Sequence, residues 1–104
     1  MAINFALMQT GNDILNILKK NKTELQEHFG VKNIGLFGSY AKGQQKKESD
    51  IDIYVELEHN HYKNVLGVIL YLEKILNHKV DLIYKNEFIR KSFLKSIERD
   101  TQYA

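Results

Sequence analysis

The sequence predicts a small α/β (α+β) domain with a mixed sheet of about three to four strands flanked by helices. Apolar residues recur at helical spacing in three stretches, at 11–30, 64–77 and 88–97. Short apolar or alternating runs of strand length stand between them, at 31–37, 50–57 and 79–84. Helices that alternate with so few strands favour one small sheet packed against helices over an extended doubly wound sheet.

Composition places the chain among single-domain globular proteins. Its 104 residues can build one modest core, and we expect residues 1–104 to form a single domain with a flexible lead-in over 1–9. The net charge of +2 is too small to indicate direct nucleic-acid binding. The absence of cysteine excludes disulfides and thiolate metal sites. No apolar run has the length of a membrane span and no signal-peptide pattern is present, so we expect a cytoplasmic protein.

The boundaries of the elements follow from local signals. The first helix should bend near 19–22 and end at Gly30, because glycine suits the left-handed position after a helix. A turn and short helix over 38–43 and a polar loop over 44–49 should link the first two strands. Gly67 interrupts the helix at 64–77, and close helix–sheet packing would explain it. Five apolar residues mark the last helix: Phe88, Ile89, Phe93, Leu94 and Ile97.

The second strand carries a pair of carboxylates on one face. Side chains alternate along a strand, so Asp50, Asp52, Tyr54 and Glu56 share one side, and the apolar residues between them face the core. Asp50 and Asp52 are then about 7 Å apart along the backbone. Like charges this close repel, and a divalent cation such as Mg²⁺, which prefers carboxylate oxygens, would relieve the repulsion.

A glycine–serine pair supplies the other half of a candidate site. Gly38 and Ser39 follow the first strand and open the short helix, where free backbone N–H groups can bind phosphate. Gly38 allows a sharp turn and close approach of the backbone, and Ser39 adds a hydroxyl. Phosphate groups at this corner and a metal ion at the carboxylates together describe a nucleoside triphosphate site.

The spacing of these residues resembles the signature of a known superfamily. Gly38-Ser39, ten residues, then Asp50-x-Asp52 is similar to the motif of nucleotidyltransferases with a DNA polymerase β-like core. With its small size, the chain resembles the minimal nucleotidyltransferases, the MNT antitoxins of MntA type that are encoded beside HEPN-domain toxins. The resemblance covers roughly residues 10–100, and it implies the minimal polymerase β-like fold.

The resemblance also implies a third acid, and Asp81 matches its position by order and strand context. Asp81 interrupts an apolar strand, so we expect it to be buried with a partner; the alternative is a strand-edge aspartate that faces water. In the family, such an acid completes a metal-binding triad with the residues that match Asp50 and Asp52. Asp81 would then lie near the attacking hydroxyl and could act as general base.

The resemblance further implies a reaction. It is a Mg²⁺-dependent transfer of AMP from ATP to a tyrosine of the cognate HEPN RNase toxin, with which the chain could form a hetero-oligomer. Two alternatives stay open: an antitoxin that neutralises the toxin by binding alone, and a nucleotidyltransferase that acts on a small molecule or RNA. The sequence leaves base preference, the number of AMP groups and the stoichiometry undetermined.

The remaining candidates are weaker. Lys42 stands where family members often carry arginine, and it is either a phosphate ligand or a solvated lysine. Lys46 and Lys47 fit a plain charged loop, and Tyr54 and Glu56 either line the pocket or face solvent. The chain lacks the P-loop, EF-hand and dinucleotide-binding patterns, so none of those sites is expected.

Overall fold

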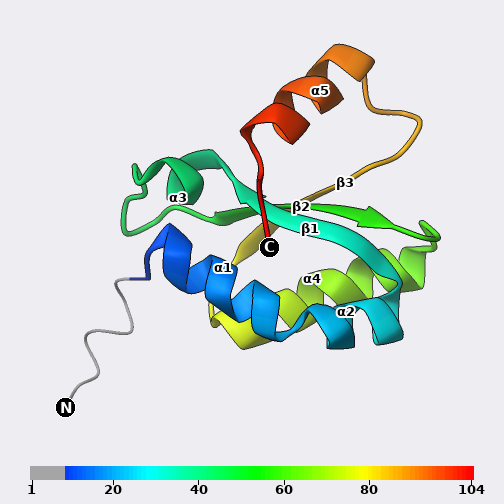
Figure 1. Ribbon diagram of the computed structural model, residues 1–104, viewed down its shortest axis with the longest axis horizontal. Coiled ribbons are helices and arrows are strands. Elements are labelled where there is room, and N and C mark those ends of the chain that lie inside the picture. The colour runs from blue at the N-terminus through cyan, green and yellow to red at the C-terminus, as the bar shows by residue number, and fades with distance from the viewer. Residues whose placement is uncertain (1–8) are drawn as a thin grey trace.

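Residues 9–104 are described by a computed structural model of the chain (Figure 1). Apart from Gln9, the predicted lead-in over 1–9 lies outside the described residues. The helices are α1 Gly11–Lys20, α2 Lys22–Phe29, α3 Gly38–Lys42, α4 Tyr62–Leu76 and α5 Lys91–Asp100. The strands are β1 Val31–Phe37, β2 Ile51–Leu57, β3 Val80–Tyr84 and β4 Gln102–Tyr103.

The strands form one mixed sheet in the order β3-β2-β1-β4. β1 runs antiparallel to β2 and to β4, whereas β2 and β3 run parallel. A parallel pair needs a crossover connection, and α4 supplies it. The expected α+β class with three to four strands is confirmed. β1 has the predicted bounds, and β2 and β3 each begin one residue later than predicted.

The two-residue strand β4 has no counterpart among the predicted elements, because two residues are too few to show an alternating pattern. It pairs with Gly35 and Leu36 of β1. A Cβ atom on Gly35 would lie 2.6 Å from the Gln102 carbonyl oxygen, so only glycine lets β4 come this close. Tyr103, for which the sequence indicated no role, therefore belongs to the sheet.

The predicted helix over 11–30 is two helices that separate at Asn21. The Asn21 backbone N–H bonds the carbonyls of Ile17 and Leu18 and ends α1, and its side chain accepts a hydrogen bond of 2.8 Å from the Tyr71 hydroxyl of α4. At the other end of α1, Thr10 and Asp13 form a capping box. Gly30 takes the expected left-handed conformation, with φ of 69°, after α2.

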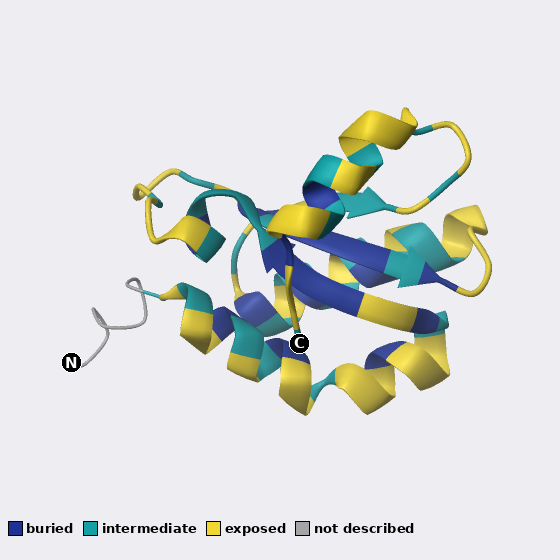
Figure 2. Cartoon of the chain, turned by 45° about the horizontal axis from the view of Figure 1, so that its top comes forward, coloured by how far each residue is buried: buried dark blue, intermediate teal, exposed yellow. Residues whose placement is uncertain are grey.

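Three helices cover one face of the sheet, and α5 lies over the other (Figure 1). We call the first the core face, because α1, α2 and α4 pack there (Figure 2). The buried core residues from these helices are Ile14, Leu18, Leu25, Val68, Leu72 and Leu76. Those from β2 are Ile51, Ile53, Val55 and Leu57, as the alternation predicts.

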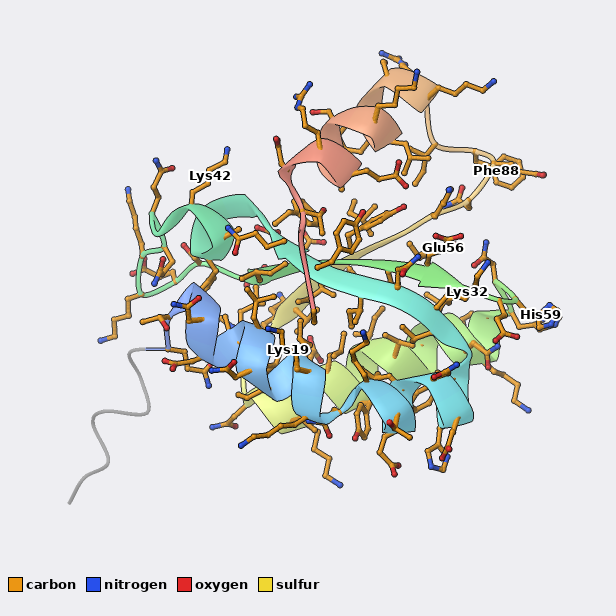
Figure 3. All side chains as sticks on the ribbon, viewed as in Figure 1. Lys19, Lys32, Lys42, Glu56, His59 and Phe88 are labelled. Carbon is orange, nitrogen blue, oxygen red and sulfur yellow. The ribbon has the colours of Figure 1, made fainter. Side chains whose placement is uncertain are left out.

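Two details of the helices differ from the sequence-based expectation. Gly67 allows α4 to approach α2, since a Cβ atom there would lie 2.6 Å from a ring carbon of Phe29; the contact is between helices, not between helix and sheet. Phe88 and Ile89 precede α5 and do not belong to it. Phe88 projects from the loop that follows β3 (Figure 3). Its apolar side chain and helical spacing had wrongly assigned it to the last helix.

Candidate active site

The start of β2 places Asp50 and Asp52. Ile51 and Ile53 are fully buried in the core, so the alternation of β2 turns Asp52 to the opposite face, where it is half-buried. Asp50 stands one residue before the strand and is exposed. Apolar alternation therefore fixes the side on which Asp52 is presented.

The register of the parallel pair places Asp81 directly beside Asp52. Paired residues on neighbouring strands point to the same face, so the two carboxylates share the side of the sheet opposite the core face. We call this side the acidic face. The expectation that Asp81 is buried is wrong: it is exposed, because β3 is an edge strand whose outer side is open at this point. Asp81 thus faces water and also adjoins Asp52.

The Gly38–Ser39 corner holds the Asp52 carboxylate. Gly38 has φ of +74°, and a Cβ atom on it would overlap the Asp52 carboxylate oxygen, so the close approach requires glycine. The Ser39 backbone N–H bonds the same carboxylate. We expected the free N–H groups of this corner to bind phosphate. At least one of them, the N–H of Ser39, instead bonds the Asp52 carboxylate and orients it.

The three aspartates act on one another electrostatically. Burial raises the pKa of Asp52, the charges of Asp81 and Asp50 raise it further, and the Ser39 N–H works in the opposite direction. Within residues 9–104, no three His, Asp or Glu side chains are close enough to hold one metal ion as they stand. The donor set still suits a hard divalent cation, since Asp81 and Asp50 both lie near enough to Asp52 for their charges to raise its pKa.

Comparison with known proteins identifies the family. A family model for the nucleotidyltransferase domain matches residues 18–104. The chain belongs to this family. Among its relatives, "Putative protein adenylyltransferase MJ1379" of Methanocaldococcus jannaschii is 50% identical over 100 residues, which is 93% of this chain and 100% of the relative. "Protein adenylyltransferase MntA" of Thermococcus cleftensis is 39% identical over 100 residues, which is 93% of this chain and 98% of the relative.

Solved structures share the fold of this nucleotidyltransferase. A "putative minimal nucleotidyltransferase" matches with a TM-score of 0.68 at 22% identity, over 85% of this chain and 93% of the other. A toxin–antitoxin crystal structure with AMP-PNP matches with a TM-score of 0.63 at 24% identity, over 91% and 72%. A tri-AMPylated Shewanella oneidensis HEPN toxin in complex with MNT antitoxin matches with a TM-score of 0.53 at 21% identity, over 89% and 66%. At these identities the likeness is one of fold.

The structure leaves Lys42 apart from the acids. In this nucleotidyltransferase it lies in the last turn of α3, is exposed, and forms no ion pair with a described residue (Figure 3). Gly43, which follows it, ends the short helix in the left-handed conformation.

Sequence reasoning missed the contacts of Tyr54. Tyr54 shares the side of Asp52, but it neither lines an open pocket nor faces solvent, since it is 1% exposed beneath α5. Its hydroxyl donates a hydrogen bond of 2.6 Å to Glu98 Oε2, and its ring meets that of Tyr103 edge to face. Burial and then the bond to Glu98 raise the pKa of Tyr54. The amphipathic pattern of α5 was a signal for a buried side, but it did not identify Glu98 as the partner.

Proposed function

We propose that this nucleotidyltransferase is the antitoxin of a HEPN/MNT pair and transfers AMP from ATP to a tyrosine of its cognate HEPN RNase toxin. The single observation that carries the proposal is the register of Asp52 with Asp81 beside the Gly38–Ser39 corner. It gathers carboxylates and backbone donors of the kind that phosphoryl transfer needs. The names of the relatives support adenylyl transfer to a protein, and the toxin–antitoxin neighbours support the partner.

The residues take distinct parts in the proposed reaction. Asp50, Asp52 and Asp81 would hold Mg²⁺, which when bound supplies positive charge against the triphosphate. The hydroxyl of Ser39, together with Lys42, would bind triphosphate oxygens, while Gly38 keeps the corner close to Asp52. Asp81 is exposed beside Asp52, so an incoming tyrosine hydroxyl can reach it and transfer its proton to the carboxylate.

The proposed reaction balances as a displacement at the α-phosphorus of ATP. A bond forms between the tyrosine oxygen and the α-phosphorus, and the bond from that phosphorus to the bridging oxygen of the β-phosphate breaks. Pyrophosphate leaves, and the tyrosine proton goes to Asp81. The acceptor is a protein in this scheme, so it needs no direct nucleic-acid contact, and we place the pair in the cytoplasm. No helix among the described residues is long and apolar enough to cross a membrane.

Labelled ATP tests the transfer. The chain is incubated with Mg²⁺ and the HEPN-domain protein encoded beside its gene, with the label on either the α- or the γ-phosphate. We expect the α-label alone to appear on the partner, at a tyrosine found by mass spectrometry. Asp52→Ala should reduce labelling to about one hundredth or less, and chelation should have a similar effect. Partner that binds the wild-type chain but stays unlabelled contradicts the proposal.

A second candidate is neutralisation by binding alone. The toxin–antitoxin neighbours support this candidate as well, since both schemes require the chain to bind a toxin. Asp52→Ala separates the two, because a masking protein without chemistry should still protect cells from the toxin, whereas a transferase should not. The Asp52→Ala chain must first be shown to bind the toxin as tightly as wild type.

A further inference from the structure

Three segments that carry the candidate site meet at one edge of the sheet. β1 ends at Phe37 and passes into α3, and Phe37 pairs with Asp52 near the start of β2. Asp52 in turn pairs with Asp81 near the start of β3. The end of β1 and the starts of β2 and β3 therefore lie together, with α3 beside them (Figure 1). The site is assembled only if α3, β2 and β3 keep their relative places.

Helix α3 is the least secured of the three. β2 and β3 are joined by a strand ladder, whereas α3 has five residues and no side-chain cap at its N-terminus. So short a helix is not stable by itself, and other parts of the chain must hold it. Tyr40 is its buried side chain, at 6% exposure, and follows Ser39 directly. The contacts of Tyr40 therefore help to decide where Ser39 lies.

The hydroxyl of Tyr40 meets His78, which lies in the connection between α4 and β3. The hydroxyl oxygen is 3.4 Å from His78 Nε2, and the two rings pack edge to face with centroids 5.9 Å apart. His78 Nδ1 is 2.9 Å from the Lys79 carbonyl oxygen. A carbonyl can only accept, so Nδ1 carries a proton, and Nε2 of the neutral ring then accepts from the Tyr40 hydroxyl. Both ring nitrogens of His78 are therefore bonded.

The Lys79 carbonyl extends this contact to β2. It also accepts a hydrogen bond of 3.0 Å from the Ile51 backbone N–H, as the two lone pairs of a carbonyl oxygen allow. Ile51 stands between the two aspartates at the start of β2, and Lys79 stands two residues before Asp81. A continuous chain of hydrogen bonds therefore joins Tyr40, through His78, to the starts of both strands.

We propose that His78 is a positioning residue, which holds α3 against the starts of β2 and β3 so that the Ser39 N–H meets the Asp52 carboxylate. This inference rests on the proposed function, to which it adds a residue outside the motif. His78 acts through Tyr40 and touches no reacting group. A misplacement of about 1 Å in a site can lower a rate by about 100-fold, so loss of this contact should slow the transfer.

Two variants that keep an aromatic ring test the contact. Tyr40→Phe and His78→Phe each remove one partner of the hydrogen bond, and kcat for AMP transfer to the HEPN-domain protein should fall at least about fivefold. The KM for that protein should stay within about twofold in Tyr40→Phe, because the changed residue is buried and the exposed surface is kept. The double variant should be no slower than the slower single variant, since both act through the same contact.

Two further variants separate position from stability. In His78→Gln the amide oxygen can accept the bond from the Tyr40 hydroxyl, so kcat should stay within about twofold of wild type. Tyr71→Phe is the matched control, because the Tyr71 hydroxyl donates its bond of 2.8 Å to Asn21, on the core face. It should lower the melting temperature at least as much as Tyr40→Phe does and leave kcat within about twofold. All rates are measured below the melting temperature of every variant.

Nuclear magnetic resonance reports the place of Ser39 without ATP, metal or partner. In the isotope-labelled full chain, the Ser39 amide proton should move upfield in Tyr40→Phe and His78→Phe, as expected of an amide that loses its bond to a carboxylate. It should keep the wild-type shift in Tyr71→Phe, which leaves α3 in place.

The outcomes separate positioning from the chemistry. If the Ser39 signal moves as expected but the wild-type chain transfers no label to its partner, the transfer proposal fails and the positioning role stands. An unmoved Ser39 signal in Tyr40→Phe and His78→Phe overturns the positioning role, whatever their activity. Wild-type kcat in both of these variants overturns it as well. So does an equal loss of kcat in Tyr71→Phe, or a His78→Gln chain that is as slow as His78→Phe.

Discussion

Helices α1, α2 and α4 cover the core face of the sheet, whereas α5 lies over the acidic face. The core face presents Ile51, Ile53 and Val55 to other apolar side chains and is closed to water. The acidic face presents Asp52, Asp81 and Glu56 and is partly open. Stability therefore resides mainly on one side of β2 and the proposed chemistry on the other, so substitutions on the two sides should have different consequences.

The largest effect on stability is expected on the core face. Leu72→Ala removes a side chain of α4 that is fully buried and should lower the free energy of unfolding by about 2–5 kcal/mol. Urea denaturation followed by circular dichroism measures the change. Leu70→Ala, two residues earlier on the exposed side, should change it by less than about 0.5 kcal/mol. Equal losses would mean that the two sides of α4 do not differ as described.

Gly38→Ala should act on both stability and transfer. A Cβ atom would displace the Asp52 carboxylate and would also strain a residue with positive φ, so we expect a loss of about 1–3 kcal/mol and a large loss of AMP transfer. Gly43→Ala is the matched control, because φ is +70° there but a Cβ atom would have no neighbour within 4 Å. It should cost about 1–2 kcal/mol of stability and keep the transfer activity. Equal activity in the two variants would refute the positioning of Asp52 by Gly38.

Tyr54→Phe tests how α5 is attached to the acidic face. The variant removes the hydrogen bond to Glu98 and keeps the packing of the ring, so unfolding should become easier by about 0.5–1.5 kcal/mol. Thermal denaturation gives the loss, and hydrogen exchange should show faster opening of α5 than of α4. Unchanged exchange in α5 would indicate that the bond does not hold the helix.

The smallest effect is expected at Glu56. A hydrogen bond from Asn33, with the charges of Lys85 and Lys32, holds the pKa of Glu56 below its usual value (Figure 3). The charged form is favoured in the folded chain, so this stabilisation exists at neutral pH and is lost as the pH falls through the lowered pKa. Glu56→Gln should lower the melting temperature slightly at pH 7, and the difference from wild type should shrink as the pH falls through the lowered pKa of Glu56 and its carboxylate takes up a proton. A difference that persists in acid would contradict this origin.

The same two faces explain what the sequence could predict. Alternation in β2 assigned the core side and the side of Asp52, because the aliphatic residues and the acids there each have one clear polarity. The motif around Gly38 indicated the family, and the order of the predicted strands then placed Asp81 on the strand beside the one that carries Asp52. Burial of Asp81 was predicted wrongly, because flanking apolar residues do not reveal whether a strand lies at the edge of a sheet.

The missed features depend on pairs of residues far apart in the chain. Tyr54 and Glu98 are 44 residues apart, and a tyrosine on an acidic side is compatible with solvent, pocket or burial. The bend that was predicted near 19–22 is a full break at Asn21, with a contact to Tyr71 of α4 that the pattern did not show, and β4, which was missed, depends on the missing side chain of Gly35. Such contacts leave little trace in local periodicity, which reports only the side of an element that is buried.

The order of the strands has a mechanical consequence for α5. The chain leaves the sheet at β3 on one edge, passes through α5, and returns at β4 on the opposite edge. This segment is thus tethered to both margins of the sheet, so the two ends of α5 stay near the sheet even when the helix opens. A load applied to α5 is therefore transmitted to the strand that carries Asp81.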